Sequence, residues 1–242
     1  MSELPVSTPE SESHSIVIKH AAVMTGDIAQ SQSLSNTAFS AVVATLKKQL
    51  QNNANLYNGS YDIYRGDAFQ LVTSQPNNAM NIAVGLRLAL KAHSPSTDVR
   101  ISVALGEAVF RTEEVRTGSG TAFVMSGRGL DSIKPQHIAF QSDNLILNQQ
   151  TQLLTRFLDV HLTGLTQIQS ETLLAYLLSE DKSHDSVADR LGKSRSNVSR
   201  ILNASQYKLV VEYLSYMEEA ITTAINNGKG CDSGKLTDSK DE

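Results

Sequence analysis

Two aspartates stand where an acidic side chain could take part in metal or phosphate chemistry. Asp27 ends an apolar stretch, and Asp67 follows Gly66 between two strand-like runs. Two carboxylates that lie close together repel each other unless a cation lies between them. Mg²⁺, which prefers oxygen ligands and often binds nucleotide phosphates, suits such a pair. Asp27 and Asp67 are therefore the predicted metal ligands, and the alternative is a turn residue and a strand-end residue with structural roles alone.

A second group of side chains, between residues 190 and 208, has the chemistry needed to bind DNA. The whole chain has a net charge of −4, which argues against general coating of nucleic acid by a basic protein. Any contact with DNA must therefore be local. The stretch 190–208 fits this demand because it holds five basic residues and no acidic one: Arg190, Lys193, Arg195, Arg200 and Lys208.

The residues around Gly192 have the spacing of a helix-turn-helix unit, in which a short helix packs across a second one. A glycine suits the turn because the backbone there favours positive φ. Ala188 supplies the small side chain that a close helix approach needs. Lys193 departs from the motif, since that position is usually apolar, and the alternative is an ordinary helical hairpin with a charged solvent face. The expected apolar contacts are Val187, Leu191, Val198 and Ile201.

The second helix of this unit presents polar side chains that could read DNA. Arginine can bind guanine through two hydrogen bonds, asparagine can do the same with adenine, and hydroxyl groups can bind phosphate. Ser194 is also expected to cap the start of the helix. Residues 165–171 resemble the entry helix of sigma-factor-like helix-turn-helix domains. The predicted DNA-binding residues are Lys193, Ser194, Arg195, Ser196, Ser199, Arg200 and Asn203.

The first 144 residues alternate between strand and helix patterns. The order β-α-β-β-α-β-α-β fits the split βαβ, or ferredoxin-like, sandwich, with helices on one face of the sheet and an extra helix and strand at the end. In that sheet the third strand lies beside the first and runs antiparallel to it, so Asp27 and Asp67 should be neighbours. The predicted strands are 21–28, 61–65, 68–73, 99–105 and 137–141; the helices are 34–53, 79–92 and 121–130; and 113–119 is a polar loop.

Several motifs of this region follow the order found in one enzyme family. They are Thr25-Gly26-Asp27, Arg65-Gly66-Asp67, the stretch 99–107, Gly120-Thr121-Ala122-Phe123 and Gly127-Arg128. Over residues 20–142 the series resembles class III nucleotidyl cyclase domains, and more closely the bacterial SatD family. The cyclase resemblance implies that Asp27 and Asp67 bind the metal and that Arg128 steadies a nucleotide phosphate.

The same resemblance is incomplete at the positions that act on the base. Val124 stands where cyclases have an asparagine, Thr121 replaces a polar residue that helps to select the base, and no lysine precedes the hairpin to read a purine. The resemblance therefore implies binding of a nucleotide or Mg²⁺ rather than cyclase catalysis.

These patterns predict an α+β chain in which a ferredoxin-like, cyclase-like sandwich precedes an all-α helix-turn-helix domain. The expected divisions are a disordered leader (1–14), the cyclase-like domain (15–144), the helix-turn-helix domain (145–225) and a disordered tail (226–242). We also predict a homodimer, because helix-turn-helix proteins commonly bind DNA as two-fold pairs. It would be held partly by an apolar stripe that could also pack within its own domain: Leu209, Tyr213, Met217, Ala220 and Ala224.

Composition narrows the setting. The single cysteine, Cys231, leaves no disulfide within the chain, the first fourteen residues lack the pattern of a secretory signal, and no run approaches the roughly 18 apolar residues of a membrane span. A cytoplasmic location without a membrane partner is expected. The predicted function is a bacterial DNA-binding transcription regulator whose N-terminal domain senses a nucleotide or metal. The alternative is a divergent nucleotidyl cyclase, or related nucleotidyltransferase, with a helical tail for dimerisation or recruitment.

Overall fold

The computed structural model describes residues 15–94, 96–111 and 114–232. The predicted leader lies outside these ranges, as does the tail from residue 233 on. The strands are β1 (Ile16–Ala29), β2 (Gly59–Tyr64), β3 (Ala68–Thr73), β4 (Asp98–Arg111), β5 (Glu114–Ser119) and β6 (Ile138–Ser142). The helices are α1 (Asn36–Leu56), α2 (Ala79–His93), α3 (Thr121–Ser132), α4 (Leu145–Gly164), α5 (Gln167–Leu177), α6 (His184–Leu191), α7 (Arg195–Ala204) and α8 (Tyr207–Asp232), with short 3₁₀ turns at Ser31–Ser33 and Pro76–Asn78.

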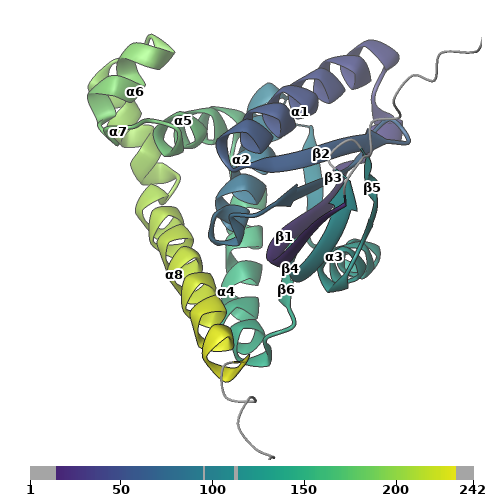
Figure 1. Ribbon diagram of the computed structural model, residues 1–242. Coiled ribbons are helices and arrows are strands. Elements are labelled where there is room, and N and C mark those ends of the chain that lie inside the picture. The colour runs from purple at the N-terminus through teal and green to yellow at the C-terminus, as the bar shows by residue number, and fades with distance from the viewer. Residues whose placement is uncertain (1–14, 95, 112–113, 233–242) are drawn as a thin grey trace, which may run out of the picture.

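One largely antiparallel sheet organises the first half of the chain (Figure 1). The strands lie in the order β2-β3-β1-β4-β5, with every neighbouring pair antiparallel. β6 joins β4 in parallel, alongside residues 101–105. The protein is therefore a mixed α/β structure built around a long central strand, β1.

Helices cover both faces of this sheet. Successive side chains of a strand point to opposite faces, and on β1 Ala22 and Met24 pack in the core with α1 and α2. The alternate residues, Ala21 and Val23, pack in a second cluster that includes residues of α3. The two helices of the predicted sandwich, α1 and α2, thus lie on one face, and the extra helix α3 covers the other one.

The sheet also extends further than its apolar pattern suggested. Residues 113–119 were expected to form a loop, whereas residues 114–119 form β5, which pairs with the far end of β4. The polar composition of β5 hides it, because Val115 is its only buried residue. In the second half of the chain α8 continues to residue 232, beyond residue 226 where the disordered tail was expected to begin.

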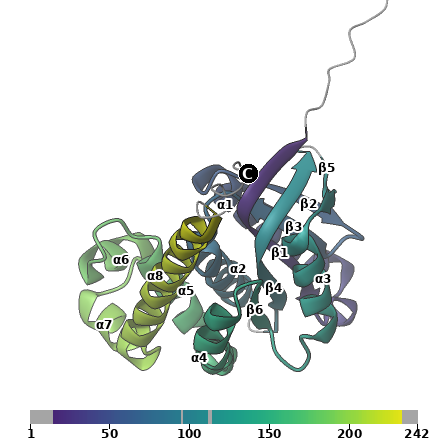
Figure 2. The same cartoon turned by 60° about the horizontal axis from the view of Figure 1, so that its bottom comes forward.

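The helical half shares its core with the sheet. α4 packs beside β6, α5 against α2, and α8 against α4 (Figures 1 and 2). Four side chains of α8 are buried in the main core, namely Val210, Leu214, Met217 and Ile221. Three members of the predicted dimerisation stripe, Tyr213, Ala220 and Ala224, are partly buried against the same core. The stripe therefore packs within the chain, and only Leu209 is largely exposed, at 62%.

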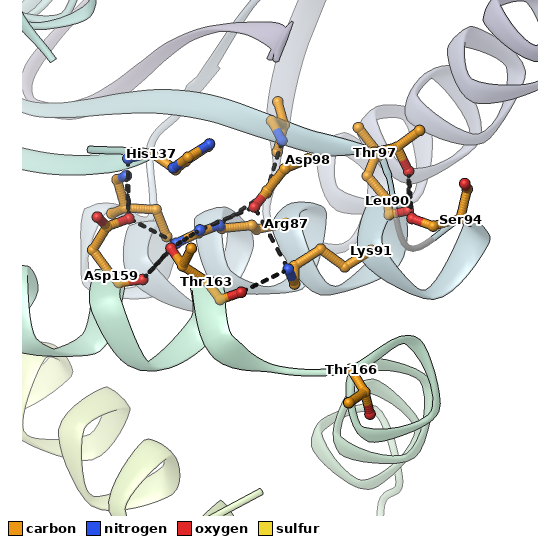
Figure 3. A network of polar contacts seen from close by, with 12 residues as sticks. Arg87, Leu90, Lys91, Ser94, Thr97, Asp98, His137, Asp159, Thr163 and Thr166 are labelled. Atoms are coloured by element: carbon orange, nitrogen blue, oxygen red, sulfur yellow. Dashed lines mark hydrogen bonds and ion pairs between the residues drawn. The ribbon is translucent and has the colours of Figure 1, made fainter. Parts of the chain in front are cut away.

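A buried ion network ties α2, β4 and α4 together (Figure 3). The Arg87 side chain is fully buried, and it pairs with Asp98 at 2.9 Å and with Asp159 at 2.7 Å. The same Asp159 oxygen accepts hydrogen bonds from the backbone N–H groups of His137 and Ile138, both at 3.0 Å. A buried charge is stable only when opposite charges and hydrogen bonds surround it. Because Asp159 also accepts hydrogen bonds from residues 137 and 138, the network fixes α4 against the start of β6.

Candidate functional site

The turn between α6 and α7 has the geometry that its glycine predicts. Gly192 adopts the left-handed conformation, with φ of 61° and ψ of 34°, and ends α6. The backbone N–H of Lys193 then bonds to the Ala188 carbonyl at 3.0 Å. Ser194 caps α7 by accepting a hydrogen bond from the Asn197 N–H at 3.3 Å, as predicted. The chain thus leaves one short helix and enters the next within three residues.

A small core of its own holds α5, α6 and α7 together. The predicted contacts Val187 and Val198 are fully buried, Ile201 and Ala188 nearly so, and Leu191 partly. α6 and α7 lie at the end of α8 that is remote from the sheet (Figures 1 and 2), whereas α5 packs against α2. α7 is thus placed where it can meet a large partner without obstruction by the sheet. The buried residues of this cluster are Ala175, Val187, Ala188, Val198 and Leu202.

Most of the predicted DNA-binding side chains are on the open face of α7. The Arg195 side chain is 68% exposed and pairs with the equally exposed Asp185 at 3.1 Å. Such exposed pairs contribute little free energy, so this contact does not prevent Arg195 from binding another anion. Arg200 is exposed and donates a hydrogen bond to the Asn197 side chain at 3.0 Å. The remaining exposed members are Ser194, Ser196 and Asn203.

Two of the predicted DNA-binding side chains instead connect α7 to its neighbours. Lys193 is half-buried and pairs with Glu171 of α5 at 2.7 Å. This ion pair explains how a lysine occupies a position that is usually apolar in the motif. Ser199, predicted to point outward, is half-buried and lies 2.7 Å from the ring nitrogen Nδ1 of His184 on α6. Both residues position α7 rather than present a free polar group.

The two aspartates lie side by side, as the predicted strand order requires. Asp27 is in register with Ala68 across β1 and β3, and the Ile28 N–H bonds to the Asp67 carbonyl at 3.3 Å. Both aspartates line a cavity of about 570 Å³, between the ends of these strands and residues 134–137. The prediction that they are neighbours is therefore confirmed.

Arg100 changes the electrostatics of this pair. The register of β1 and β4 places Arg100 directly opposite Asp27, and its guanidinium donates to both carboxylate oxygens, at 2.7 and 2.5 Å. Asp67 accepts a hydrogen bond from the Ser31 hydroxyl at 2.5 Å. Arg100 thus supplies the positive charge beside Asp27 that was predicted to come from a metal ion. The pairing of Arg100 with Asp27 depends on the register of β1 and β4, which the sequence pattern did not give.

The rest of the cavity offers nitrogen donors rather than further acids. No group of three or more histidine, cysteine or acidic side chains that could hold a metal occurs in the described part of the chain. Lys134 and His137 line the cavity with Arg100, and burial lowers the pKa of His137, so this ring is mainly neutral at pH 7. Arg128, the predicted phosphate ligand, is exposed on α3 and is not among the described residues that line this cavity.

Comparison with known proteins shows partial structural likeness. No protein-family model matches the chain, and no curated protein matches it in sequence. The catalytic core of a rhodopsin-guanylyl cyclase with converted specificity, in complex with ATPalphaS, is 16% identical with a TM-score of 0.40, over 49% of this chain and 75% of that chain. A bacterial light-regulated adenylyl cyclase is 14% identical with a TM-score of 0.41, over 52% and 76%.

A third structure, the monomeric guanylyl cyclase domain of the RhoGC fusion protein from the aquatic fungus Blastocladiella emersonii, is 15% identical with a TM-score of 0.37, over 49% and 78%. About half of the chain is thus similar to nucleotidyl cyclase domains. At this level of similarity the matches establish no activity, ligand or partner.

Among the described residues, no helix has the length and hydropathy to span a bilayer.

Proposed function

We propose that this protein is a DNA-binding transcription regulator that inserts α7 into the major groove. The observation that carries the proposal is the exposed face of α7, which presents two arginines, an asparagine and two serines, in a stretch (194–204) without an acidic residue. The left-handed turn at Gly192 and the core beneath α6 and α7 support it, because they hold α7 rigidly on its inner side.

The chemistry of that face suits a duplex. Arg195 and Arg200 can each donate two hydrogen bonds to the O6 and N7 atoms of guanine, and Asn203 can bind the edge of adenine. The hydroxyl groups of Ser194 and Ser196, beside the N-terminus of α7, suit backbone phosphates. Because the net charge of the chain is negative, its contact with DNA must be local. The exposed face of α7 offers such a contact.

The test is a selection of bound duplexes from a random-sequence library, made with the full chain. We expect an enriched sequence motif, because the arginines and the asparagine on α7 would read base edges. The same selection with a variant that carries Arg195→Ala and Arg200→Ala should give no motif. Recovery of unenriched DNA by the wild type would contradict the proposal.

A second candidate function follows from the cavity that Asp27 and Asp67 line: binding of Mg²⁺ and a nucleotide by a cyclase-like domain, with or without catalysis. The adjacency of Asp27 and Asp67 favours it, since Mg²⁺ is often held by one or two carboxylates together with substrate phosphates. The donor set fits only in part, because Arg100 already neutralises Asp27. The ferredoxin-like and SatD-like relationships inferred from sequence belong to this candidate and stay predictions.

Thermal unfolding tests this second candidate. If the aspartates share a cation, Mg²⁺ or Mn²⁺ should raise the Tm, because a ligand that binds only the folded state stabilises it. Asp67→Asn should abolish that rise. A nucleoside triphosphate should add to the rise, and Arg128→Ala should remove only this addition if Arg128 contacts phosphate. An unchanged Tm with all of these ligands would leave Asp27 and Asp67 with structural roles.

A further inference from the structure

The outer face of α4 carries apolar side chains that the described part of the chain leaves uncovered. Ile146, Leu153, Phe157 and Val160 are 66%, 60%, 67% and 72% exposed. The opposite face of the same helix is conventional core, with Leu147 and Leu162 among its buried residues. α4 is therefore apolar on both sides, although only one side has a partner among the described residues.

The spacing along the outer face is that of a helix-pairing seam. The intervals alternate between four and three residues, the heptad pattern by which two helices keep one stripe in mutual contact. Apolar residues that merely lie on a surface show no such order. The seam positions are Ile146, Gln150, Leu153, Phe157, Val160 and Gly164.

A groove borders each half of this seam, and the two grooves lie on opposite sides of it. On one side Leu153, Phe157 and Val160 border a hollow of about 500 Å³ with residues 135–137. On the other side Ile146 and Gln150 border one of about 420 Å³ with residues of α8. A ridge flanked by grooves is the surface that a second helix packs against, with its own side chains filling the grooves.

We infer that a second copy of this chain covers the seam, with α4 packed against α4 across a two-fold axis. The four exposed apolar side chains offer on the order of 500 Å² per copy, near the upper limit for a monomer's largest apolar patch. With the groove walls added, the buried surface approaches the ~800 Å² per partner of a stable interface. The six seam positions hold no charged residue, so like charges do not meet along the seam itself; Arg156 lies in the groove beside it.

This interface differs from the one that the sequence suggested. The stripe on α8 packs within the chain, whereas the seam on α4 is exposed in the part of the chain that the structure describes. The inference does not rest on the proposed DNA binding, because association through α4 is measurable without DNA.

The experiment is light scattering of the full chain at tens of micromolar, without DNA. We expect twice the chain mass of 26.3 kDa for the wild type and the chain mass for Phe157→Glu, which places two like charges in an apolar seam. The matched control is Leu209→Glu, which introduces the same charge on α8, outside the seam. Leu209 is 62% exposed, close to the exposure of Phe157. This control should remain dimeric.

Folding of each variant is checked by its circular dichroism and thermal unfolding curve. Phe157 is exposed, so Phe157→Glu should keep the fold; Leu153→Glu serves as a second seam variant in case it does not. A monomeric wild type, or a dimer that persists in both folded seam variants, would overturn the inference. Dissociation by Leu209→Glu would also do so, because it would place the interface on α8.

Discussion

The charge of Arg87 lies inside the core, where opposite charges and hydrogen-bond acceptors surround it. Asp98 and Asp159 supply two opposite charges within 3 Å, and Thr163 accepts a further hydrogen bond at 2.6 Å. Removing one member of a buried pair costs more than the pair contributes, because the other charge remains buried. The network is therefore more important for holding α4 in place than for net stability.

Arg87→Met tests this arrangement. We expect a loss of about 3–5 kcal/mol in the free energy of unfolding, because Asp159 remains buried without its cation, while Asp98 keeps only Lys91, at 3.8 Å. Urea denaturation followed by circular dichroism measures it. Arg116→Met is the control, since the Arg116 side chain is 61% exposed and its pair with Asp62 is 3.6 Å long. A similar loss in both variants would refute the role assigned to Arg87.

Asp181, in the turn between α5 and α6, should make the stability of the fold depend on pH in the acidic range. Hydrogen bonds from Ser179 and Ser183 lower the pKa of its carboxyl group from 3.8 to about 2. Because the folded pKa lies below the unfolded value, its stabilising effect is present above about pH 3.8 and is lost as the pH falls towards 2. NMR titration of the side-chain carboxyl should give this low value in the wild type. It should rise towards 3.8 in the Ser179→Ala, Ser183→Ala double variant, and an unchanged titration would contradict the assignment.

Single-residue features were predictable from the sequence where they depend on residues close in the chain. The cap at Ser194 and the left-handed turn at Gly192 depend on residues close in the chain, and both were predicted. Arg87 and Arg100 were missed because their partners Asp159 and Asp27 are more than 70 residues away. An arginine in an amphipathic helix or strand resembles a solvated one until the tertiary contacts are known.

At the scale of single elements, the turn before α7 is the feature on which the proposed DNA-binding surface depends. Gly192 has a φ of 61°, a conformation that costs other L residues roughly 1–2 kcal/mol. Gly192→Ala should therefore lower the free energy of unfolding by about 1 kcal/mol. Gly127→Ala on α3 is the opposite case, since an added Cβ meets open space within a helix, and it should raise stability by about 0.5–1 kcal/mol.

Chemical denaturation of the two glycine variants distinguishes backbone strain from loss of a glycine as such. Equal changes in the free energy of unfolding in both variants would contradict the strain assigned to the left-handed backbone at Gly192.

Elements with a clear apolar period were predictable, and polar or atypical ones were not. The helices now labelled α1, α2 and α3 and the strands β2 and β3 lie close to their predicted ranges. β5 was missed because its buried apolar content is one residue. The stripe of α8 was recognised as apolar, but its partner could not be inferred, since intramolecular and intermolecular packing require the same periodicity.

At the scale of the whole molecule, the two halves of the chain are less independent than their compositions suggest. Side chains of α4, α5 and α8, such as Leu158, Leu173 and Met217, belong to one cluster with those of the sheet and α2. The domain boundary near residue 144 stays a prediction. A continuous core gives a physical route by which a change in the cavity beside Asp27 could reach the helices that carry α7.

DNA binding by α7 is tested most directly by titrating a labelled duplex of the selected sequence with the full chain and following fluorescence anisotropy. Arg195→Ala and Arg200→Ala should each raise the Kd by roughly 5- to 150-fold, the equivalent of about 1–3 kcal/mol for an arginine that reads a guanine. Arg116→Ala, a similarly exposed arginine on β5, should bind as the wild type does. Equal affinities for the wild type and the two folded α7 variants would contradict the proposed function.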